Sequence, residues 1–237
     1  MLPPLHWRNQ VRVWLHRHPL ELRLHYPDIG DLHLPQEPVV FDVGSNTGQF
    51  AESMLAWRPR ACVHAFEPQA CALAAMKSLL GGYPRASFNA FALGAQPCMR
   101  KFFVSRFDQA SSFLPNGEVL AHGVGGIDFT TQEEIEVEIR TLADYARERG
   151  VERIDLLKLD VQGFEIEVFK GAAPVLDRID WIYSEAQFKE LYEGGPRWTD
   201  QAAFLHAHGF DLIRMCGFRR DDSGDLMECD MLFRRRR

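Results

Sequence analysis

The 237-residue chain fits one globular domain, with an ordinary 46% of apolar and 25% of charged residues. Its formal net charge of −6 gives no basis for an extended nucleic-acid surface, so we expect no nucleic-acid partner. Five scattered cysteines without a C-x-x-C pair argue against a zinc site and a disulfide framework, and they suit a reducing cytoplasm. No apolar run approaches the ~18 residues of a membrane span, so we expect no transmembrane segment and a cytoplasmic location.

The N-terminal residues 1–38 are expected to form an extension that packs on or caps the core of a main domain at residues 39–237. Prolines are frequent just before residue 39, where the first strong strand begins. Residues 7–24 mix apolar and basic side chains at roughly helical spacing. For this segment, capping the core is favoured over contact with a membrane surface.

The first half of the main domain alternates strand and helix. Short apolar runs predict strands at residues 39–43, 61–66 and 87–93, with helices at 49–57 and 69–80 between them. Strands that alternate with helices indicate a parallel sheet that is covered on both faces.

The rhythm changes between residues 98 and 142, where strands at 101–104 and 135–139 flank a loop rich in serine and glycine. A loop of this length in a compact domain is more often functional than idle. Ser111 and Ser112 are therefore candidate acceptor-binding residues. His122 is a candidate base, although a surface histidine is the more common case.

Strand–helix alternation then resumes and the chain closes with two strands. The predicted strands lie at 155–161 and 181–185, the helices at 164–176 and 200–208, and the final antiparallel pair at 210–216 and 227–233. The fold class is therefore α/β, with a doubly wound, mostly parallel sheet. Ligands on such sheets bind beyond the carboxyl ends of the strands, where the strand order switches.

A glycine-rich turn follows the first strand directly. Asp42, Gly44 and Gly48 form a D-x-G-x-x-x-G pattern, and Glu67 follows at the end of the second strand. A carboxylate in that place can accept two hydrogen bonds from a ribose diol. A dinucleotide site would show G-x-G-x-x-G instead, and the opening acid suits a cationic amino-acid end better than a pyrophosphate.

Four motifs together resemble the FkbM family of S-adenosylmethionine-dependent methyltransferases: residues 42–48 (DVGSNTG), 66–68 (FEP), 157–165 (LKLDVQGFE) and 170–172 (KGA). The resemblance covers residues 39–233, nearly the whole chain. It implies a Rossmann-like, seven-stranded methyltransferase fold with S-adenosylmethionine as cofactor. Family members are mainly O-methyltransferases that act on hydroxyls of natural products and of sugars in cell-surface glycans.

The resemblance also implies roles for individual residues. Gly44 and Gly48 would lie under the methionine part of the cofactor, Asp42 near its amino group, and Glu67 on the ribose. Ala92 would line the adenine pocket, and Asp160 would lie close to the methyl group. The expected cofactor-binding residues are Asp42, Gly44, Asn46, Thr47, Gly48, Glu67, Ala92 and Asp160.

Three carboxylates are candidates for the chemical step: Asp160, Glu185 and Glu165. A sugar hydroxyl is a very weak acid, so a base or a metal ion helps methyl transfer to it. Asp160 or Glu185 could be the base, or both could hold Mg²⁺; the metal-free version is favoured because a third oxygen ligand is not evident. Glu165 could equally complement the dipole of the helix that it starts.

Tyr192 and Trp198 could supply an apolar platform for a sugar, or could simply pack.

The expected function is O-methylation of a sugar hydroxyl in a surface glycan or a glycosylated natural product. The alternatives are methylation of a polyketide hydroxyl or small-molecule amine, a non-catalytic cofactor-binding module, and a nicotinamide dehydrogenase. The turn at residues 160–163 lacks the Asn/Asp-Pro-Pro-aromatic motif of many nucleic-acid methyltransferases. Monomer and homo-oligomer both stay open.

Overall fold

The computed structural model describes residues 27–30 and 32–236. The segment 7–24 therefore lies outside the described residues. Of the extension, Ile29, Leu32 and Leu34 are buried in the core. None of the helices in the described ranges is long and apolar enough to cross a membrane.

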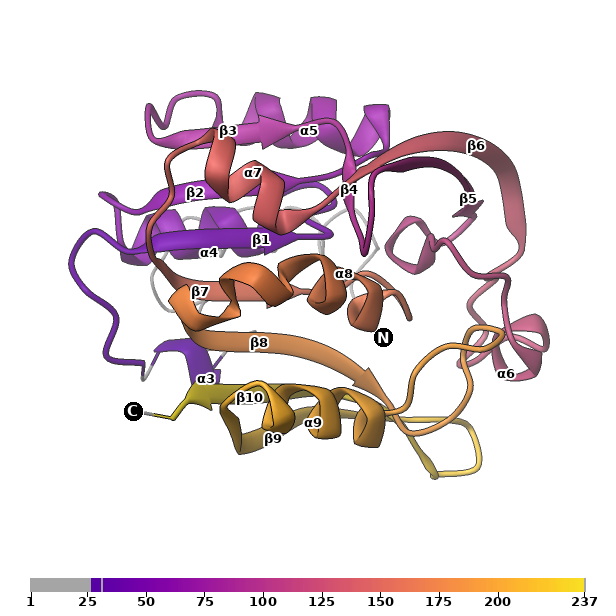
Figure 1. The fold of residues 1–237 in the computed structure, drawn as a ribbon. Helices are drawn as coiled ribbons and strands as arrows, with labels where there is room; N and C mark the ends of the chain where they lie inside the picture. The colour runs from indigo at the N-terminus through magenta and orange to yellow at the C-terminus, as the bar shows by residue number, and fades with distance from the viewer. Residues whose placement is uncertain (1–26, 31, 237) are drawn as a thin grey trace, which may run out of the picture.

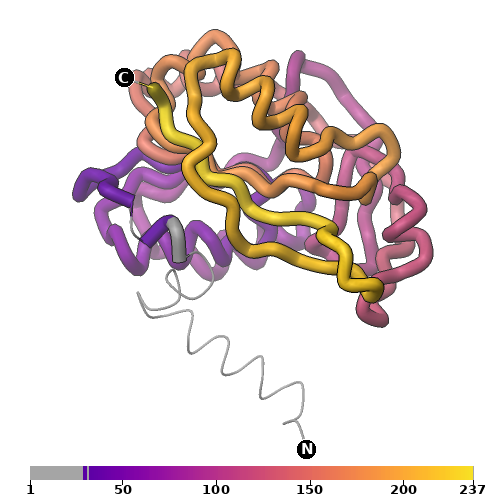
Figure 2. Tube along the Cα trace, turned by 90° about the horizontal axis from the view of Figure 1, so that it is seen from below, coloured from indigo at the N-terminus to yellow at the C-terminus, as the bar shows by residue number. Residues whose placement is uncertain are grey.

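A seven-stranded sheet forms the centre of the molecule (Figure 1). The strands that pair in parallel are β3, β2, β1, β7 and β8, and β10 and β9 extend the sheet by antiparallel pairing. In sheet order they are β3 (Ala86–Asn89), β2 (Cys62–Phe66), β1 (Val39–Val43), β7 (Ile154–Leu159), β8 (Ile179–Gln187), β10 (Leu226–Arg235) and β9 (Phe210–Arg220). Figure 2 shows the last two strands running side by side. This order confirms the predicted doubly wound sheet, and its switch point lies between β1 and β7.

Helices cover both faces of this sheet because successive residues of each strand point to opposite faces. Val40 packs toward one core and Phe41 toward the other. The first face carries α3 (Pro27–Gly30), α4 (Gln49–Trp57) and α5 (Ala70–Leu80). The second carries α7 (Leu142–Glu148), α8 (Glu165–Ala172) and α9 (Trp198–Ala207) (Figure 1).

A second, three-stranded sheet lies beyond the carboxyl ends of the main strands (Figure 1). It consists of β4 (Ala92–Leu93), β6 (Thr131–Arg140) and β5 (Cys98–Ser105), in that order. A 3-10 turn (Asp108–Ala110) and α6 (Glu118–Ala121) lie in the connection between β5 and β6. The change of rhythm in the sequence thus corresponds to a separate small sheet that faces the ligand side of the large one.

The prediction of one strand at residues 87–93 was wrong. Strand β3 stops at Asn89, which is opposite Phe66, the last residue of its neighbour β2. The Asn89 side chain donates to the Ala65 carbonyl at 3.0 Å and fixes the strand end. Beyond this point the large sheet offers no partner, so Ala92 and Leu93 pair with β6 of the small sheet instead.

Two helical segments also differ from expectation. Helix α7 was not predicted, although Thr141 caps it by accepting from the Asp144 N–H at 3.0 Å. The predicted helix at 164–176 is α8 followed by a 3-10 turn, Ala173–Arg178. Pro174 explains this break because its ring has no N–H to continue the helical pattern.

Candidate active site

A cavity of about 680 Å³ opens at the carboxyl ends of β1, β2, β7 and β8, between the large sheet and the small one. Its lining falls into two parts. The glycine half contains Gly44, Asn46, Glu67 and Ala92. The carboxylate half contains Asp160, Gln162, Glu185, Tyr192, Arg219, Glu228 and Asp230. The switch point of the sheet thus carries a cleft, as open α/β sheets lead one to expect.

The two glycines of the turn are required by the packing of the protein itself. A Cβ on Gly44, whose φ is +73°, would lie 1.8 Å from the Asp160 carbonyl oxygen. A Cβ on Gly48, whose φ is +90°, would lie 2.8 Å from the Met76 side chain. Gly44 lines the cavity, whereas Gly48 faces α5. The absent Cβ of Gly44 therefore lets the end of β1 touch the end of β7, which brings the two halves together.

Glu67 is held at the end of β2 by backbone donors. One carboxylate oxygen accepts from the Asn46 N–H at 2.9 Å and the other from the Gln69 N–H at 2.8 Å. Burial raises the pKa of Glu67 to about 7, and the two backbone hydrogen bonds oppose that rise. Each oxygen keeps a second lone pair, so the carboxylate can accept two more hydrogen bonds from a ligand in the cavity.

Asp42 does not reach the cavity. Its side chain is fully buried and pairs with Lys158 Nζ at 3.1 Å. Lys158 also donates to the Gly44 carbonyl at 2.8 Å and itself lines the cavity. The acid that opens the glycine motif therefore acts through a buried lysine, which sequence reasoning missed. Thr47 lies outside the lining too, and its N–H donates to Asn46 Oδ1 at 2.6 Å.

In the carboxylate half, one glutamine joins two acids. The Gln162 amide nitrogen donates to Asp160 Oδ1 at 2.6 Å and to Glu185 Oε2 at 2.7 Å. Its amide oxygen accepts from the Tyr192 hydroxyl at 2.6 Å. The structure thus brings Asp160 and Glu185 together, and Gln162 connects both to Tyr192, whose hydroxyl forms a hydrogen bond here where the sequence suggested an apolar platform or simple packing.

Arg219 supplies the positive charge of this half. It pairs with Glu185 Oε1 and with Glu228 Oε1 from neighbouring strands. Burial raises the pKa of Glu185 well above its ordinary value, and the charges of Asp160 and Glu228 add to this effect. Burial likewise raises the pKa of Asp230 to about 6. The acids outnumber the cation, so the carboxylate half suits a ligand that carries positive charge.

The side chains do not fit the Mg²⁺ alternative at Asp160 and Glu185. Both oxygens of Glu185 already face donors, the Gln162 amide and the Arg219 guanidinium. In the described part of the chain, no group of three or more His, Cys, Asp or Glu side chains has a metal-binding arrangement. The metal-free version of the chemistry agrees better with this donor set.

Glu165 holds the turn between Asp160 and α8. Its Oε1 accepts from the Val161 and Gly163 N–H groups, both at 3.2 Å, and its side chain is buried outside the cavity lining. Burial raises the pKa of Glu165 to about 7. The geometry therefore supports the structural alternative for Glu165 over contact with a substrate.

The two serines also hold loops. Ser111 lines the cavity and its hydroxyl donates to the Asp108 carbonyl at 3.2 Å, while Ser112 donates to the Gln162 carbonyl at 2.6 Å. Ser112 does not line the cavity, so its hydroxyl reaches the site only through Gln162.

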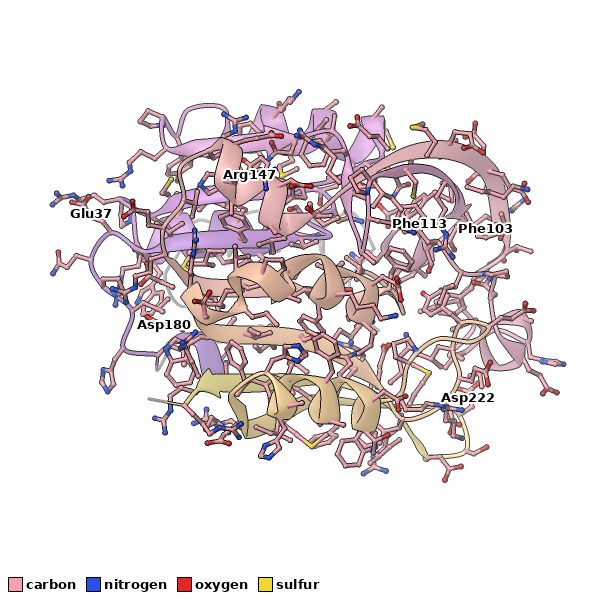
Figure 3. The ribbon with its side chains drawn as sticks, viewed as in Figure 1. Glu37, Phe103, Phe113, Arg147, Asp180 and Asp222 are labelled. Atoms are coloured by element: carbon pink, nitrogen blue, oxygen red, sulfur yellow. The ribbon has the colours of Figure 1, made fainter. Side chains whose placement is uncertain are left out.

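Apolar side chains form the wall that continues from the carboxylate half. Phe113 lies on the small-sheet side of the molecule (Figure 3) and packs edge-on against Phe102, with ring centroids 4.9 Å apart. Asp222 of the β9–β10 turn lies at this end of the molecule (Figure 3) and accepts from the N–H of the cavity-lining Gly125 at 3.1 Å. The apolar wall comprises Phe102, Phe107, Phe113, Leu120, Ile127, Phe129, Leu191 and Met227.

The structure does not bring His122 and Trp198 to the cavity. His122 is exposed, with Nδ1 2.7 Å from the Glu118 carbonyl of its own short helix. Trp198 starts α9 and packs on Phe188, with ring centroids 5.9 Å apart. Neither side chain lines the cleft.

Sequence reasoning missed Gln162, Lys158, Arg219 and Glu228 as site residues. Gln162 and Lys158 lie within the 157–165 motif, where a polar residue in a buried strand or sharp turn is a usable signal. Arg219 and Glu228 meet because they are cross-strand partners of β9 and β10. No local pattern shows that these two strands reach the site.

Comparison with known proteins agrees with this geometry. The Methyltransferase FkbM domain matches residues 42–219 of the chain. The 2-O-methyltransferase NoeI of Sinorhizobium fredii is 32% identical over 177 residues, which is 73% of this chain and 72% of NoeI. The 31-O-demethyl-FK506 methyltransferase FkbM of Streptomyces tacrolimicus is 30% identical over 194 residues, 74% of this chain and 73% of that protein.

Among solved structures, a chain of a fibrillarin/Nop5p complex aligns with a TM-score of 0.52 at 11% identity, covering 93% of this chain and 82% of that chain. This likeness concerns the fold alone. The doubly wound sheet, the glycine turn after β1 and the family match place the chain in the class of Rossmann-like methyltransferases that use S-adenosylmethionine. Within this class, the chain belongs to the FkbM methyltransferase family.

Proposed function

We propose that the protein methylates a hydroxyl of a sugar that is attached to an apolar aglycone, with Asp160 as the general base. The observation that carries this proposal is the continuity of one cavity from Glu67 through Asp160 and Glu185 to the apolar wall. The cofactor and an acceptor can therefore lie in line within one cleft.

The glycine half fits S-adenosylmethionine. The free lone pairs of Glu67 suit a ribose diol, and Ala92 offers an apolar surface beside it. Lys158 lines the same half and suits the carboxylate of the methionine part. The cofactor supplies an activated methyl group on a sulfonium, so the protein mainly has to align the acceptor and remove its proton.

The carboxylate half supports Asp160 as the base. Its Oδ1 accepts from Gln162, and no donor among residues 27–30 and 32–236 is bonded to Oδ2. An acceptor hydroxyl within hydrogen-bond reach of Oδ2 could transfer its proton there. The surrounding acids also favour the positive charge of the cofactor over its neutral product, which helps product release.

The apolar wall supports the aglycone. Aromatic and aliphatic side chains bind an apolar group by removing its surface from water, at roughly 25 cal/mol per Å². A free sugar would leave this wall unused. The names of both relatives reported above describe methyl transfer to an oxygen atom, at a 2-O and a 31-O position. This supports a hydroxyl as the acceptor.

The rival acceptors make different use of the same cavity. A polyketide hydroxyl would also use the apolar wall, and a small amine would use the surplus of acids. We favour a hydroxyl over an amine because a weakly acidic nucleophile needs the base that Asp160 offers, and the comparison of octyl glycosides with n-octanol below distinguishes a sugar hydroxyl from a simple alcohol. All five cysteines are free, which supports a reducing compartment and hence action in the cytoplasm.

A methyl-transfer assay tests this proposal. The purified chain is incubated with S-adenosylmethionine and a panel of n-octyl glycosides of different sugars, methyl glycosides of the same sugars, n-octanol and n-octylamine. Mass spectrometry should show the addition of one methylene unit to at least one octyl glycoside, with less transfer to its methyl counterpart. Methylation of octylamine or octanol without any glycoside product would contradict the proposal.

A further inference from the structure

Gln162 occupies a backbone conformation that its residue type rarely adopts. Its φ is +54°, in the left-handed region, and only one other non-glycine residue of the described chain, Asn46, has a positive φ. Such conformations persist where the surrounding structure holds them, and they concentrate at functional sites. Here the conformation turns the side chain back across the end of β7, between the two catalytic candidates.

Two residues from distant segments fix this side chain and its backbone. The Ser112 hydroxyl donates to the Gln162 carbonyl at 2.6 Å, and the Tyr192 hydroxyl donates to the amide oxygen at 2.6 Å. Tyr192 is buried, and its hydroxyl lies near two acceptors, the Gln162 amide oxygen at 2.6 Å and the Ala110 carbonyl at 3.2 Å, of which the amide oxygen is the nearer. The amide nitrogen faces the two carboxylates, because their oxygens can only accept when ionised, and this leaves the amide oxygen toward Tyr192.

The two N–H groups of that nitrogen are both used. One is directed to Asp160 Oδ1 at 2.6 Å and the other to Glu185 Oε2 at 2.7 Å. Arg219 takes the remaining oxygen of Glu185. Each oxygen of Glu185 therefore already has a donor, whereas Oδ2 of Asp160 has none among the described residues and faces a ligand without competition.

We infer that Gln162 is a positioning residue that makes Asp160, and not Glu185, the base of the reaction. It donates to Asp160 Oδ1, leaves Oδ2 for the acceptor, and places a neutral donor between the two acids. Ser112 and Tyr192 support it from the loops that close the acceptor side. This inference rests on the proposed function, in which Asp160 is the general base. It adds Gln162 as the residue that gives Asp160 this role.

Besides the neutral Gln162 amide, several titratable groups act on Asp160. The pH dependence of kcat therefore includes their contributions. Glu185 comes from β8, Glu228 and Asp230 from β10, Glu165 from α8, Asp42 from β1 and Tyr192 from the connection between β8 and α9. The cations Arg219 and Lys158 pair with Glu185 and Asp42 of this set. None of these groups places a neutral donor on Asp160. A substitution of Gln162 should therefore change the pH profile of kcat in a way that substitutions of these other groups do not.

The isosteric Gln162→Glu exchange tests the inference. It replaces the bridging donor by a third acid, so the carboxylate form of Asp160 loses a hydrogen bond and gains a like charge. With the best octyl glycoside of the panel above, we expect kcat near neutral pH to fall by roughly 10- to 100-fold. The acidic limb of the kcat profile should move to higher pH by about one unit. Affinity for S-adenosylhomocysteine should change by less than ~3-fold.

Two further variants keep the test sharp. Gln162→Asn tolerates a positive φ and keeps an amide that is too short to reach both acids, so we expect a smaller shift of the same sign. Exposed Gln132→Glu on β6 is the matched control and should leave the profile unchanged. An unshifted acidic limb in Gln162→Glu, with wild-type transfer present, would overturn this inference alone. Wild-type protein without transfer to any glycoside would overturn the proposed function and this inference with it.

Discussion

The glycine half and the carboxylate half of the cavity are built in different ways. Gly44, Asn46 and Glu67 follow two consecutive strands, and backbone N–H groups of the turns after these strands hold the Glu67 carboxylate. The carboxylate half draws Asp160, Tyr192 and Arg219 from separate segments that only the fold brings together. The glycine half is therefore formed by residues that are close in the sequence, whereas the carboxylate half is formed by residues that only the tertiary structure brings together.

This difference suggests that binding and chemistry are separable. In the proposed function, the glycine half presents the Glu67 carboxylate, which two backbone N–H groups hold in place, to the cofactor. The carboxylate half concentrates acids of raised pKa around one guanidinium, which is typical of groups that move protons. Substitutions in the two halves should therefore alter different measurable quantities.

The largest effect is expected from Asp160→Asn. The amide cannot accept a proton, so kcat should fall by roughly 10²- to 10⁴-fold, the usual contribution of a general base. Asp180→Asn is the matched control, because Asp180 lies at the opposite end of the sheet and pairs with Arg153 (Figure 3). Single-turnover rates with the octyl glycoside that the wild type methylates check this. Unchanged turnover in Asp160→Asn would remove Asp160 from the reaction.

Gly44→Ala should break the junction between the halves. The new Cβ meets a backbone carbonyl that cannot rotate away, at a position with φ +73°. Steric overlap and backbone strain together should lower the free energy of unfolding by about 3 kcal/mol or more. Urea denaturation followed by circular dichroism measures this change.

Gly150→Ala is the control for that substitution. Gly150 has φ +62° but nothing within 4 Å of the added Cβ, so only the strain of about 1 kcal/mol remains. Equal losses in the two variants would show that the contact between β1 and β7 does not matter for stability.

Glu165→Gln tests the structural role of that acid by its pH dependence. The folded pKa of about 7 lies above the ordinary value of 4.5, so the folded state holds a proton that the unfolded state loses first. The wild type therefore loses stability as pH rises from about 4.5 to 7, whereas glutamine does not titrate. The variant should gain about 1 to 3 kcal/mol relative to wild type between roughly pH 5 and pH 8.

Denaturation at several pH values provides the measurement, and exposed Glu152→Gln is the matched control. A stability difference that stays constant over this range would mean that the Glu165 carboxyl is not buried as the structure shows. A small effect on kcat is expected, since Glu165 lies outside the cavity lining.

Much of the fold and of the glycine half could be predicted from sequence because the signals are local. A buried strand, a glycine turn and an acid at the next strand end specify Gly44 and Glu67 within one βαβ unit. The break between β3 and β4 could not be predicted, since the apolar run through residues 87–93 is continuous. It arises where the neighbouring strand β2 ends, which is a property of the sheet.

The carboxylate half could be predicted only in part. Asp160 and Glu185 lie at strand ends, where a parallel sheet gathers ligand-binding groups. Arg219 reaches them from β9, two strands beyond β8 in the sheet, and this depends on the order of β10 and β9. His122 and Trp198 were chosen for their chemistry alone, and the fold turns both away from the cleft.

Calorimetric titration with S-adenosylhomocysteine tests most directly whether the two halves are separable. The measurement compares wild type, Glu67→Gln and Asp160→Asn. Glu67→Gln should weaken binding by roughly 10- to 100-fold, because hydrogen bonds to a charged acceptor contribute ~1.5–3 kcal/mol. Asp160→Asn should bind within ~3-fold of wild type. Wild-type affinity in Glu67→Gln, or an equal loss in both variants, would contradict the account.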